Sequence, residues 1–294
     1  MLNKILFTIK SRGIFGFISS IRQYVFPVKA TSFNLCEEFI SNKTGLEIGG
    51  PSTVFKKTGI LPVYPIVKHL DNCNFSKVTT WEGSINEGVS FNFDENSPPG
   101  KQYLAEATDL SEINSSEYDF ILSSHMLEHT ANPLKALSEW TRILKDDGFI
   151  IILLPHRDGI FDHQRPVTTL NHMIEDFEYE TQEDDLTHLP EILMLHDLSL
   201  DSTAGTLQSF KERSENNFEN RCLHQHVFDT NLAVNLLHHQ HLQIHSVEVI
   251  LPCHIIMIAQ KISLEKSLNN EKFLNSTAEC KLQSPFPSDK ILSA

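Results

Sequence analysis

The chain has 294 residues, of which 40% are hydrophobic and 21% are charged, and its formal net charge is −14 at pH 7. This length suffices for one sizeable α/β domain with an insertion, and the composition is that of an ordinary soluble globular enzyme. The negative charge argues against a general affinity for DNA or RNA phosphates, so a small-molecule or carbohydrate partner is favoured over a nucleic acid.

The cysteines are scattered, with no CxxC pair. They are Cys36, Cys73, Cys222, Cys253 and Cys280. An odd, dispersed set in a chain of this length is typical of reduced thiols in a cytoplasmic protein, and it disfavours a zinc site made of cysteines.

Residues 1–30 differ in kind from the rest of the chain. They carry basic residues and no acidic one, among many apolar side chains. Charges interrupt every apolar run, so the roughly 20 apolar residues of a membrane-spanning helix are missing here. Two interpretations stay open for this basic amphipathic segment. It could lie on the inner membrane surface as a peripheral contact, or pack on the domain with its lysines in solvent.

The next part of the chain alternates between strand-like and helix-like patterns, which is typical of a parallel α/β sheet. Strands are predicted at residues 44–48, 67–70, 102–107, 118–123 and 149–154. A helix is predicted at 133–144, where apolar residues recur at helical spacing behind a first-turn proline.

The pattern loosens at residues 157–228, which we interpret as an insertion after the fifth strand. A helix near 231–238 and two strands at 244–251 and 254–261 then complete a main domain over residues 31–262. Residues 263–294 are polar and weakly patterned, so they are predicted to form a mobile tail.

The sharpest motif is LEIGGPS at residues 46–52. Its first strand ends in an acidic residue, Glu47, and runs into Gly49 and Gly50, where a backbone without side chains can approach a ligand closely. The pattern G-x-G-x-x-G of nicotinamide-binding enzymes is absent from this turn.

This motif resembles the first motif of the class I S-adenosylmethionine-dependent methyltransferases, although Pro51 stands where that family usually has another glycine. The stretch from 118 to 156, YDFILSSHMLEHTANPLKALSEWTRILKDDGFIIILLPH, is similar to the fourth strand, following helix and fifth strand of the family. The resemblance implies a Rossmann-like sheet, mostly parallel with the last strand antiparallel. It also implies that the chain is an enzyme and that S-adenosylmethionine is its cofactor.

The resemblance also implies cofactor-binding residues. Glu47, Gly49 and Gly50 would hold the methionine end, Asp71 the ribose, and Glu106 or its competitor Asp109 the adenine. Ser124 would line the cofactor on its acceptor side, while Glu128 and His129 would fix the start of the following helix.

A histidine suits the role of general base because its pKa lies near neutrality. His125 and His156 follow adjacent strands at the edge where open α/β sheets bind ligands, and His163 comes shortly after. These three are the catalytic candidates.

The insertion is expected to build the acceptor pocket. Its segments FDHQRPVTTLNH and LHQHVFD resemble predicted methyltransferases encoded with sugar and surface-glycan enzymes. That likeness implies methyl transfer to a hydroxyl of a sugar or glycan precursor. A catalytically silent binding protein of the same fold and methylation of a nucleic-acid or protein acceptor remain the alternatives.

The same segments could hold a divalent metal that lowers the pKa of an acceptor hydroxyl. The candidate ligands are Asp162, His163, His188, His224 and His226. His-x-His spacing equally suits the wall of a polar pocket, which is the favoured interpretation.

Overall fold

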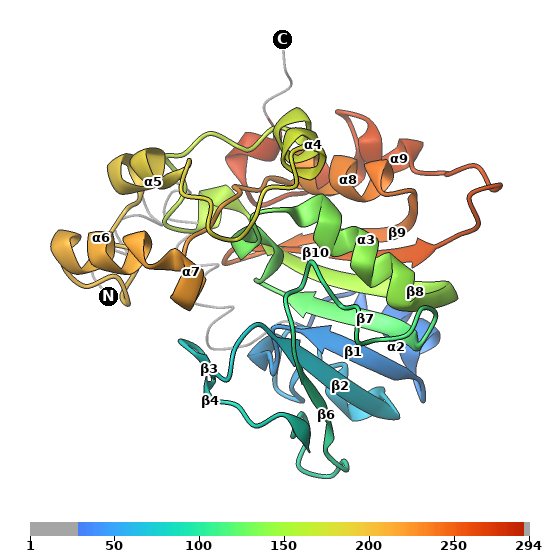
Figure 1. The fold of residues 1–294 in the computed structure, drawn as a ribbon. Helices are drawn as coiled ribbons and strands as arrows, with labels where there is room; N and C mark the ends of the chain where they lie inside the picture. The colour runs from blue at the N-terminus through green and yellow to red at the C-terminus, as the bar shows by residue number, and fades with distance from the viewer. Residues whose placement is uncertain (1–28, 291–294) are drawn as a thin grey trace.

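An eight-stranded sheet in the order β5-β6-β2-β1-β7-β8-β10-β9 organises the chain (Figure 1). The computed structural model describes residues 29–290. The strands are β1 (Thr44–Ile48), β2 (His69–Asn74), β5 (Gly88–Phe91), β6 (Gly100–Leu104), β7 (Tyr118–Ser124), β8 (Leu144–Pro155), β9 (Leu242–Ile250) and β10 (His254–Lys261). The five strands from β6 to β8 in the sheet order run parallel, while β10 is antiparallel to both β8 and β9. The predicted mostly parallel sheet with an antiparallel last strand is confirmed.

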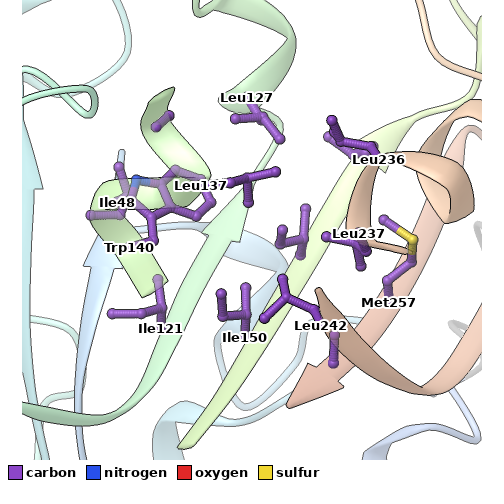
Figure 2. Packing of buried hydrophobic residues seen from close by; sticks show 14 of the residues in the cluster. Ile48, Ile121, Leu127, Leu137, Trp140, Ile150, Leu236, Leu237, Leu242 and Met257 are labelled. Carbon is purple, nitrogen blue, oxygen red and sulfur yellow. The ribbon is translucent and has the colours of Figure 1, made fainter. Parts of the chain in front are cut away.

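The central strands are buried on both faces, which explains why they are almost wholly apolar. In β7, Ile121 belongs to one hydrophobic cluster, whereas Phe120 and Leu122 belong to the cluster on the opposite face. The helices α3 (Pro133–Ile143) and α8 (Thr230–His239) cover the first face, and α2 (Phe33–Ile40) covers the second. Figure 2 shows Trp140 of α3 packed over Ile48 and Ile121 in the first cluster.

Helix α3 begins where the sequence places it. The side chain of Asn132 accepts a hydrogen bond from the backbone N–H of Lys135, and Pro133 occupies the first turn, where its missing N–H costs nothing. The predicted helix over 133–144 is therefore confirmed, with its end one residue earlier.

The second strand differs from the prediction. Strand β2 spans His69–Asn74 instead of 67–70, and its register pairs Leu46 with Asp71. Its sequence, HLDNCN, is polar and does not look like a buried strand. The polarity is tolerated because Asn72 and Asn74, both buried, form side-chain hydrogen bonds to the neighbouring loop. The third strand also begins earlier than predicted, at Gly100.

The insertion after β8 forms a helical lobe beside the carboxyl ends of the parallel strands (Figure 1). Its helices are α4 (Leu170–Glu178), α5 (Leu189–Leu195), α6 (Leu207–Glu215) and α7 (Asn217–Asn220). A small apolar cluster of its own, with Ile192, Phe210 and Leu223, stabilises the lobe. Between β2 and β5 lies a short hairpin, β3 (Val78–Thr79) and β4 (Gly83–Ser84).

The predicted mobile tail over 263–294 differs from the structure. Residues 271–290 form the short helices α9 (Glu271–Leu274), α10 (Glu279–Leu282) and η5 (Pro287–Lys290), and Phe286 is fully buried. The Asp289 carboxylate accepts a hydrogen bond from the Thr230 hydroxyl at the start of α8. One buried aromatic ring and one paired carboxylate therefore anchor a segment that looks unpatterned in sequence.

The predicted basic amphipathic segment, residues 1–30, lies almost entirely outside the described residues. Within residues 29–290, no helix combines the length and the apolar character that crossing a bilayer requires.

Candidate functional site

A cavity of about 900 Å³ opens at the carboxyl ends of β1, β2 and β7. One part of its wall is the Gly49–Gly50 turn with Asn74, and another is His125 with Arg221 of the lobe. Ligands bind at this edge of open α/β sheets, and the volume lies at the upper end of the roughly 300–1,000 Å³ of small-molecule sites. The cavity can therefore hold a cofactor and a second small molecule side by side.

The glycine turn forms the cavity wall next to β1. Gly49 has φ of +83°, and a Cβ at Gly50 would lie 2.3 Å from Cδ of Glu47, so both positions require glycine. Asn72, on strand β2, forms two hydrogen bonds to the turn. Its Oδ1 accepts from the Gly50 N–H at 3.0 Å, and its Nδ2 donates to the Gly50 carbonyl at 3.0 Å. Asn74 donates to the same carbonyl at 3.1 Å. The turn is held in shape before any ligand binds.

Glu47, a predicted cofactor ligand, lies behind the turn and does not line the cavity. Its fully buried carboxylate accepts hydrogen bonds from the Tyr64 hydroxyl at 2.6 Å and from the Ser52 N–H at 3.0 Å. Burial raises the pKa of Glu47 to about 7. Through these hydrogen bonds the Glu47 side chain stabilises the loop that follows the glycines.

Asp71, predicted to bind the ribose, also lies away from the cavity. It accepts hydrogen bonds from the Lys101 N–H at 2.6 Å and from the Tyr118 hydroxyl at 2.8 Å. Strand β2 begins and ends later in the chain than predicted. Asp71 therefore lies in the middle of the strand, and Asn74 lies at its end and lines the cavity.

Only one of the two residues predicted to bind the adenine lies at the cavity. Glu106 lines the cavity and forms an ion pair with Arg221, whose Nη2 lies 2.5 Å from Oε1 of Glu106. Asp109 lies outside the cavity. The ion pair joins the third parallel strand to the lobe across the cavity mouth.

His125 stands at the end of β7, directly after Ser124, and both residues line the cavity. Its φ of +51° is unusual for a residue with a side chain. Its Nε2 lies 2.8 Å from Nδ1 of His254, the first residue of β10. Burial, reinforced by the neighbouring imidazoles, lowers the pKa of His125 well below its usual value, so the ring is neutral.

The other two catalytic candidates do not reach the cavity. His156 is fully buried, stacks on the Phe286 ring at 4.1 Å between centroids, and has its Nε2 3.2 Å from Asp289. His163 lies 3.1 Å from Asp197 in the lobe. The isolated bridge between His156 and Phe228 shows that this histidine joins the sheet to the lobe.

The five predicted metal ligands do not converge on one point. Asp162 and His224 are hydrogen-bonded, whereas His188 and His226 form a separate group with His172. His163 belongs to neither group.

Several cavity residues were not predicted from the sequence. These are Asn74, Trp81, His129, Arg221 and His254. Only Asn74 carried a usable signal, since it would have been found had β2 been placed at its true end. His129 follows β7 closely but was assigned to the helix start, while Trp81, Arg221 and His254 come from distant segments that only the folded chain brings together.

Comparisons with known proteins agree with this geometry. The family model described as a methyltransferase domain matches residues 78–152, from β3 into β8. No curated protein matches the chain in a sequence comparison.

Solved structures with a similar fold include three methyltransferases. A SAM-dependent methyltransferase from Aquifex aeolicus is 12% identical, with 82% of this chain and 93% of that chain covered and a TM-score of 0.42. A SAM-dependent methyltransferase from Methanosarcina mazei is 14% identical, with 78% and 97% covered and a TM-score of 0.43. The trans-methyltransferase CalH in complex with SAH is 12% identical, with 78% and 54% covered and a TM-score of 0.42.

The mostly parallel sheet with antiparallel β10, the glycine turn at the end of β1 and the matched methyltransferase segment define the class of this protein. It is an S-adenosylmethionine-dependent methyltransferase, and its cofactor is S-adenosylmethionine. The predicted methyltransferase activity and the predicted cofactor, S-adenosylmethionine, are confirmed.

Proposed function

We propose that this enzyme methylates a hydroxyl group of a small polar acceptor, a sugar or a glycan precursor, with His125 as the general base. The observation that carries the proposal is the position of His125. It follows β7 at the edge where the cofactor lies in this class, and it faces the same cavity as the glycine turn.

For methyl transfer the protein has two tasks, to position the acceptor hydroxyl and to remove its proton. Bound S-adenosylmethionine supplies an electrophilic methyl group. The chain must then hold the acceptor oxygen in line with that group and accept the hydroxyl proton. A neutral imidazole does this, and the hydrogen bond to His254 fixes the orientation of the His125 ring.

The walls opposite the glycine turn suit a polar, ring-shaped acceptor. Trp81 is 55% exposed on the cavity wall and meets the His129 ring edge-on at 5.3 Å. Its indole face can cover the apolar face of a sugar ring, while Arg221 and Glu183 offer a donor and an acceptor for hydroxyl groups. The likeness of the insertion to methyltransferases encoded with glycan enzymes supports the same acceptor class.

The test is methyl transfer from radiolabelled S-adenosylmethionine to free hexoses, nucleotide-linked hexoses, bulk RNA and denatured protein. We expect label in a hexose and a mass gain of one methylene group. Trp81→Ala should raise KM for that acceptor about tenfold, because its loss removes on the order of 1–2 kcal/mol of contact.

Tyr179→Ala is the matched control, since Tyr179 is also exposed but lies outside the cavity. Label in RNA or protein and not in hexoses would contradict the proposed acceptor. Tight cofactor binding with no transfer to any acceptor class would favour a catalytically silent relative.

A further inference from the structure

Glu128 is a buried carboxylate that lies close to several imidazoles but is hydrogen-bonded to none of them. It lies on η3 (Leu127–His129), between β7 and α3, and is fully buried. Among the described residues, no donor reaches either of its carboxylate oxygens within hydrogen-bonding distance. Burying an ionised carboxylate costs several kcal/mol unless it is paired or coordinates a metal. This side chain therefore points to a cationic ligand.

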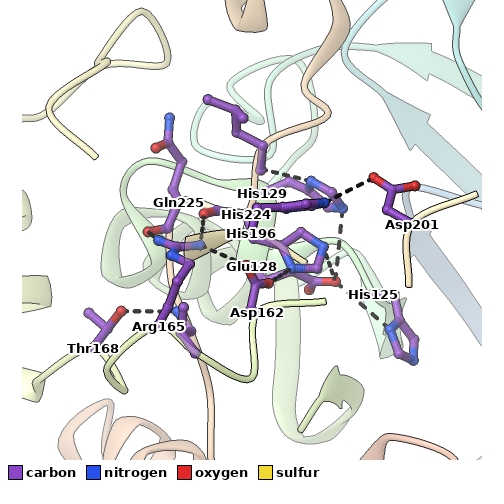
Figure 3. Close-up of polar contacts among 12 residues, drawn as sticks. His125, Glu128, His129, Asp162, Arg165, Thr168, His196, Asp201, His224 and Gln225 are labelled. Atoms are coloured by element: carbon purple, nitrogen blue, oxygen red, sulfur yellow. Dashed lines mark hydrogen bonds and ion pairs between the residues drawn. The ribbon is translucent and has the colours of Figure 1, made fainter. Parts of the chain in front are cut away.

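Three imidazoles lie near the same carboxylate (Figure 3), and one of them, His125, has its Nδ1 3.9 Å from Oε1 of Glu128. Nε2 of His129 and Nε2 of His224 each lie 3.9 Å from Oε1 of Glu128. The two rings stand nearly perpendicular, at 81°, with centroids 4.6 Å apart. Glu128, His129 and His224 come from η3 and from the end of the lobe, segments about 95 residues apart that the fold brings together.

The far side of each imidazole is already occupied. Nδ1 of His129 donates to the Leu223 carbonyl at 2.9 Å, because a carbonyl oxygen can only accept. Nδ1 of His224 donates to the Asp162 carboxylate at 2.5 Å, and Arg165 in turn holds that carboxylate at 3.1 Å. Metal-binding histidines are oriented in this way, by a carbonyl or carboxylate on the nitrogen that does not bind the metal. Both Nε2 atoms are left for coordination.

We propose that Glu128, His129 and His224 bind one divalent transition-metal ion at the acceptor side of the cavity. Two imidazoles and one carboxylate are a ligand set for Zn²⁺, Fe²⁺ or Mn²⁺, whereas Mg²⁺ and Ca²⁺ prefer oxygen ligands alone. The coordinating atoms lie within 4.8 Å of one another, so small side-chain rotations bring each to the roughly 2.1 Å of a metal bond. His129 also lines the cavity, which places the ion's remaining positions next to a bound acceptor.

Two other histidine groups are weaker candidates. In the first, His125 and His254 are hydrogen-bonded to each other at 2.8 Å, with Cys253 as the third member. In the second, Nε2 of His172 and Nε2 of His188 are 3.0 Å apart and satisfy each other. Coordination would break these bonds, whereas at Glu128 it breaks none.

The experiment is a titration of the metal-depleted full-length protein with Co²⁺, followed by displacement with Zn²⁺. We expect one Co²⁺ per chain and visible ligand-field absorption without a thiolate-to-cobalt charge-transfer band. Such a band would place the ion at Cys253 and overturn the proposal. So would the absence of binding by folded protein at about 1 mM Co²⁺, since transition-metal sites of this kind bind far more tightly.

Variants locate the ion. Glu128→Gln should weaken Co²⁺ binding at least 100-fold, and Asp162→Asn, which disturbs the orientation of His224 and the contact with Arg165, about 10- to 100-fold. His188→Gln is the matched control and should bind as the wild type does. Loss of binding in His188→Gln with retention in Glu128→Gln would place the ion in the other histidine group and contradict the assignment.

Circular dichroism and S-adenosylhomocysteine binding confirm that each variant is folded. If a variant fails to fold, the Co²⁺ spectrum of the wild-type protein still tests the ligand set. None of these measurements depends on methyl transfer, so the metal site can fail while the proposed activity stands.

Discussion

The two ends of the cavity are built in different ways. At the cofactor end, uncharged groups hold the glycine turn, and the side-chain amide of Asn72 is hydrogen-bonded to Gly50 through both its oxygen and its nitrogen. At the acceptor end lie ionisable groups, among them the buried Glu128 and the hydrogen-bonded pair of His125 and His254. The cofactor end is thus a preformed surface for a ligand common to the whole class. On the proposed function, the acceptor end holds the groups that can move protons or bind an ion.

The largest expected effect separates catalysis from cofactor binding. His125→Ala should lower kcat by about 10²–10⁴, the usual contribution of a general base. Binding of S-adenosylmethionine should change little. His163→Ala, in the lobe and outside the cavity, is the control and should keep wild-type kcat. An unchanged kcat in His125→Ala would show that His125 is not the general base.

The next effect concerns the glycine turn. Gly50→Ala puts a Cβ 2.3 Å from the Glu47 carboxyl carbon, so the turn or Glu47 must shift. A displacement of about 1 Å should lower cofactor affinity on the order of 100-fold. Gly205→Ala is the control: Gly205 lies outside the cavity and its added Cβ would meet Ser209 only at 3.5 Å, so calorimetry should show unchanged affinity. Wild-type affinity in Gly50→Ala would show that the cofactor does not contact this turn.

A smaller effect distinguishes the two polar residues of β2. Asn74→Ala should weaken cofactor binding about tenfold, the value of one lost hydrogen bond, because Asn74 lines the cavity. Asp71→Asn should leave cofactor affinity unchanged and lower the free energy of unfolding by about 1–3 kcal/mol, since one of the two donors, the Lys101 N–H or the Tyr118 hydroxyl, then faces an NH₂ group and loses its acceptor. The reverse pattern would restore Asp71 as the ribose ligand.

The smallest effect is a pH dependence of stability. The pKa of Glu47 is about 7 in the folded protein and near 4.5 when exposed. Between these values the unfolded chain releases a proton that the folded chain keeps, so the wild-type free energy of unfolding should fall as pH rises from about 4.5 to about 7. Glu47→Gln should have a smaller slope, and the rest comes from Glu128 and Glu183, whose pKa burial also raises to about 7. Chemical denaturation of both proteins across that range measures it, and parallel curves would contradict the raised pKa.

The sequence predicted the regions where local pattern and burial agree. Strands β1, β7 and β10 and helix α3 are apolar or capped in the expected way, and the last antiparallel strand followed from the family resemblance. The prediction was wrong at β2, because its buried polar residues bind the neighbouring loop and the sequence therefore lacks the apolar pattern of a buried strand. That error of a few residues led to Asp71, in the middle of the strand, instead of Asn74, which stands at the strand end and lines the cavity.

The acceptor end could be predicted only in part. His125 was found because it follows a clear strand. The partners of Glu128 and Arg221 come from segments about 95 and 115 residues distant, and no spacing rule joins them. His156 was placed at the correct strand end, yet Phe286 and Asp289 cover it, from a segment with no periodicity in sequence.

The most direct test of this account is a calorimetric titration of the wild-type protein with S-adenosylhomocysteine, with Gly50→Ala in parallel. The account predicts a single site with a dissociation constant on the order of 10 µM, and strongly weakened binding in the variant. Folded wild-type protein that gives no binding heat up to about 1 mM ligand would contradict it, because the cavity at the ends of β1, β2 and β7 would then not be a cofactor site.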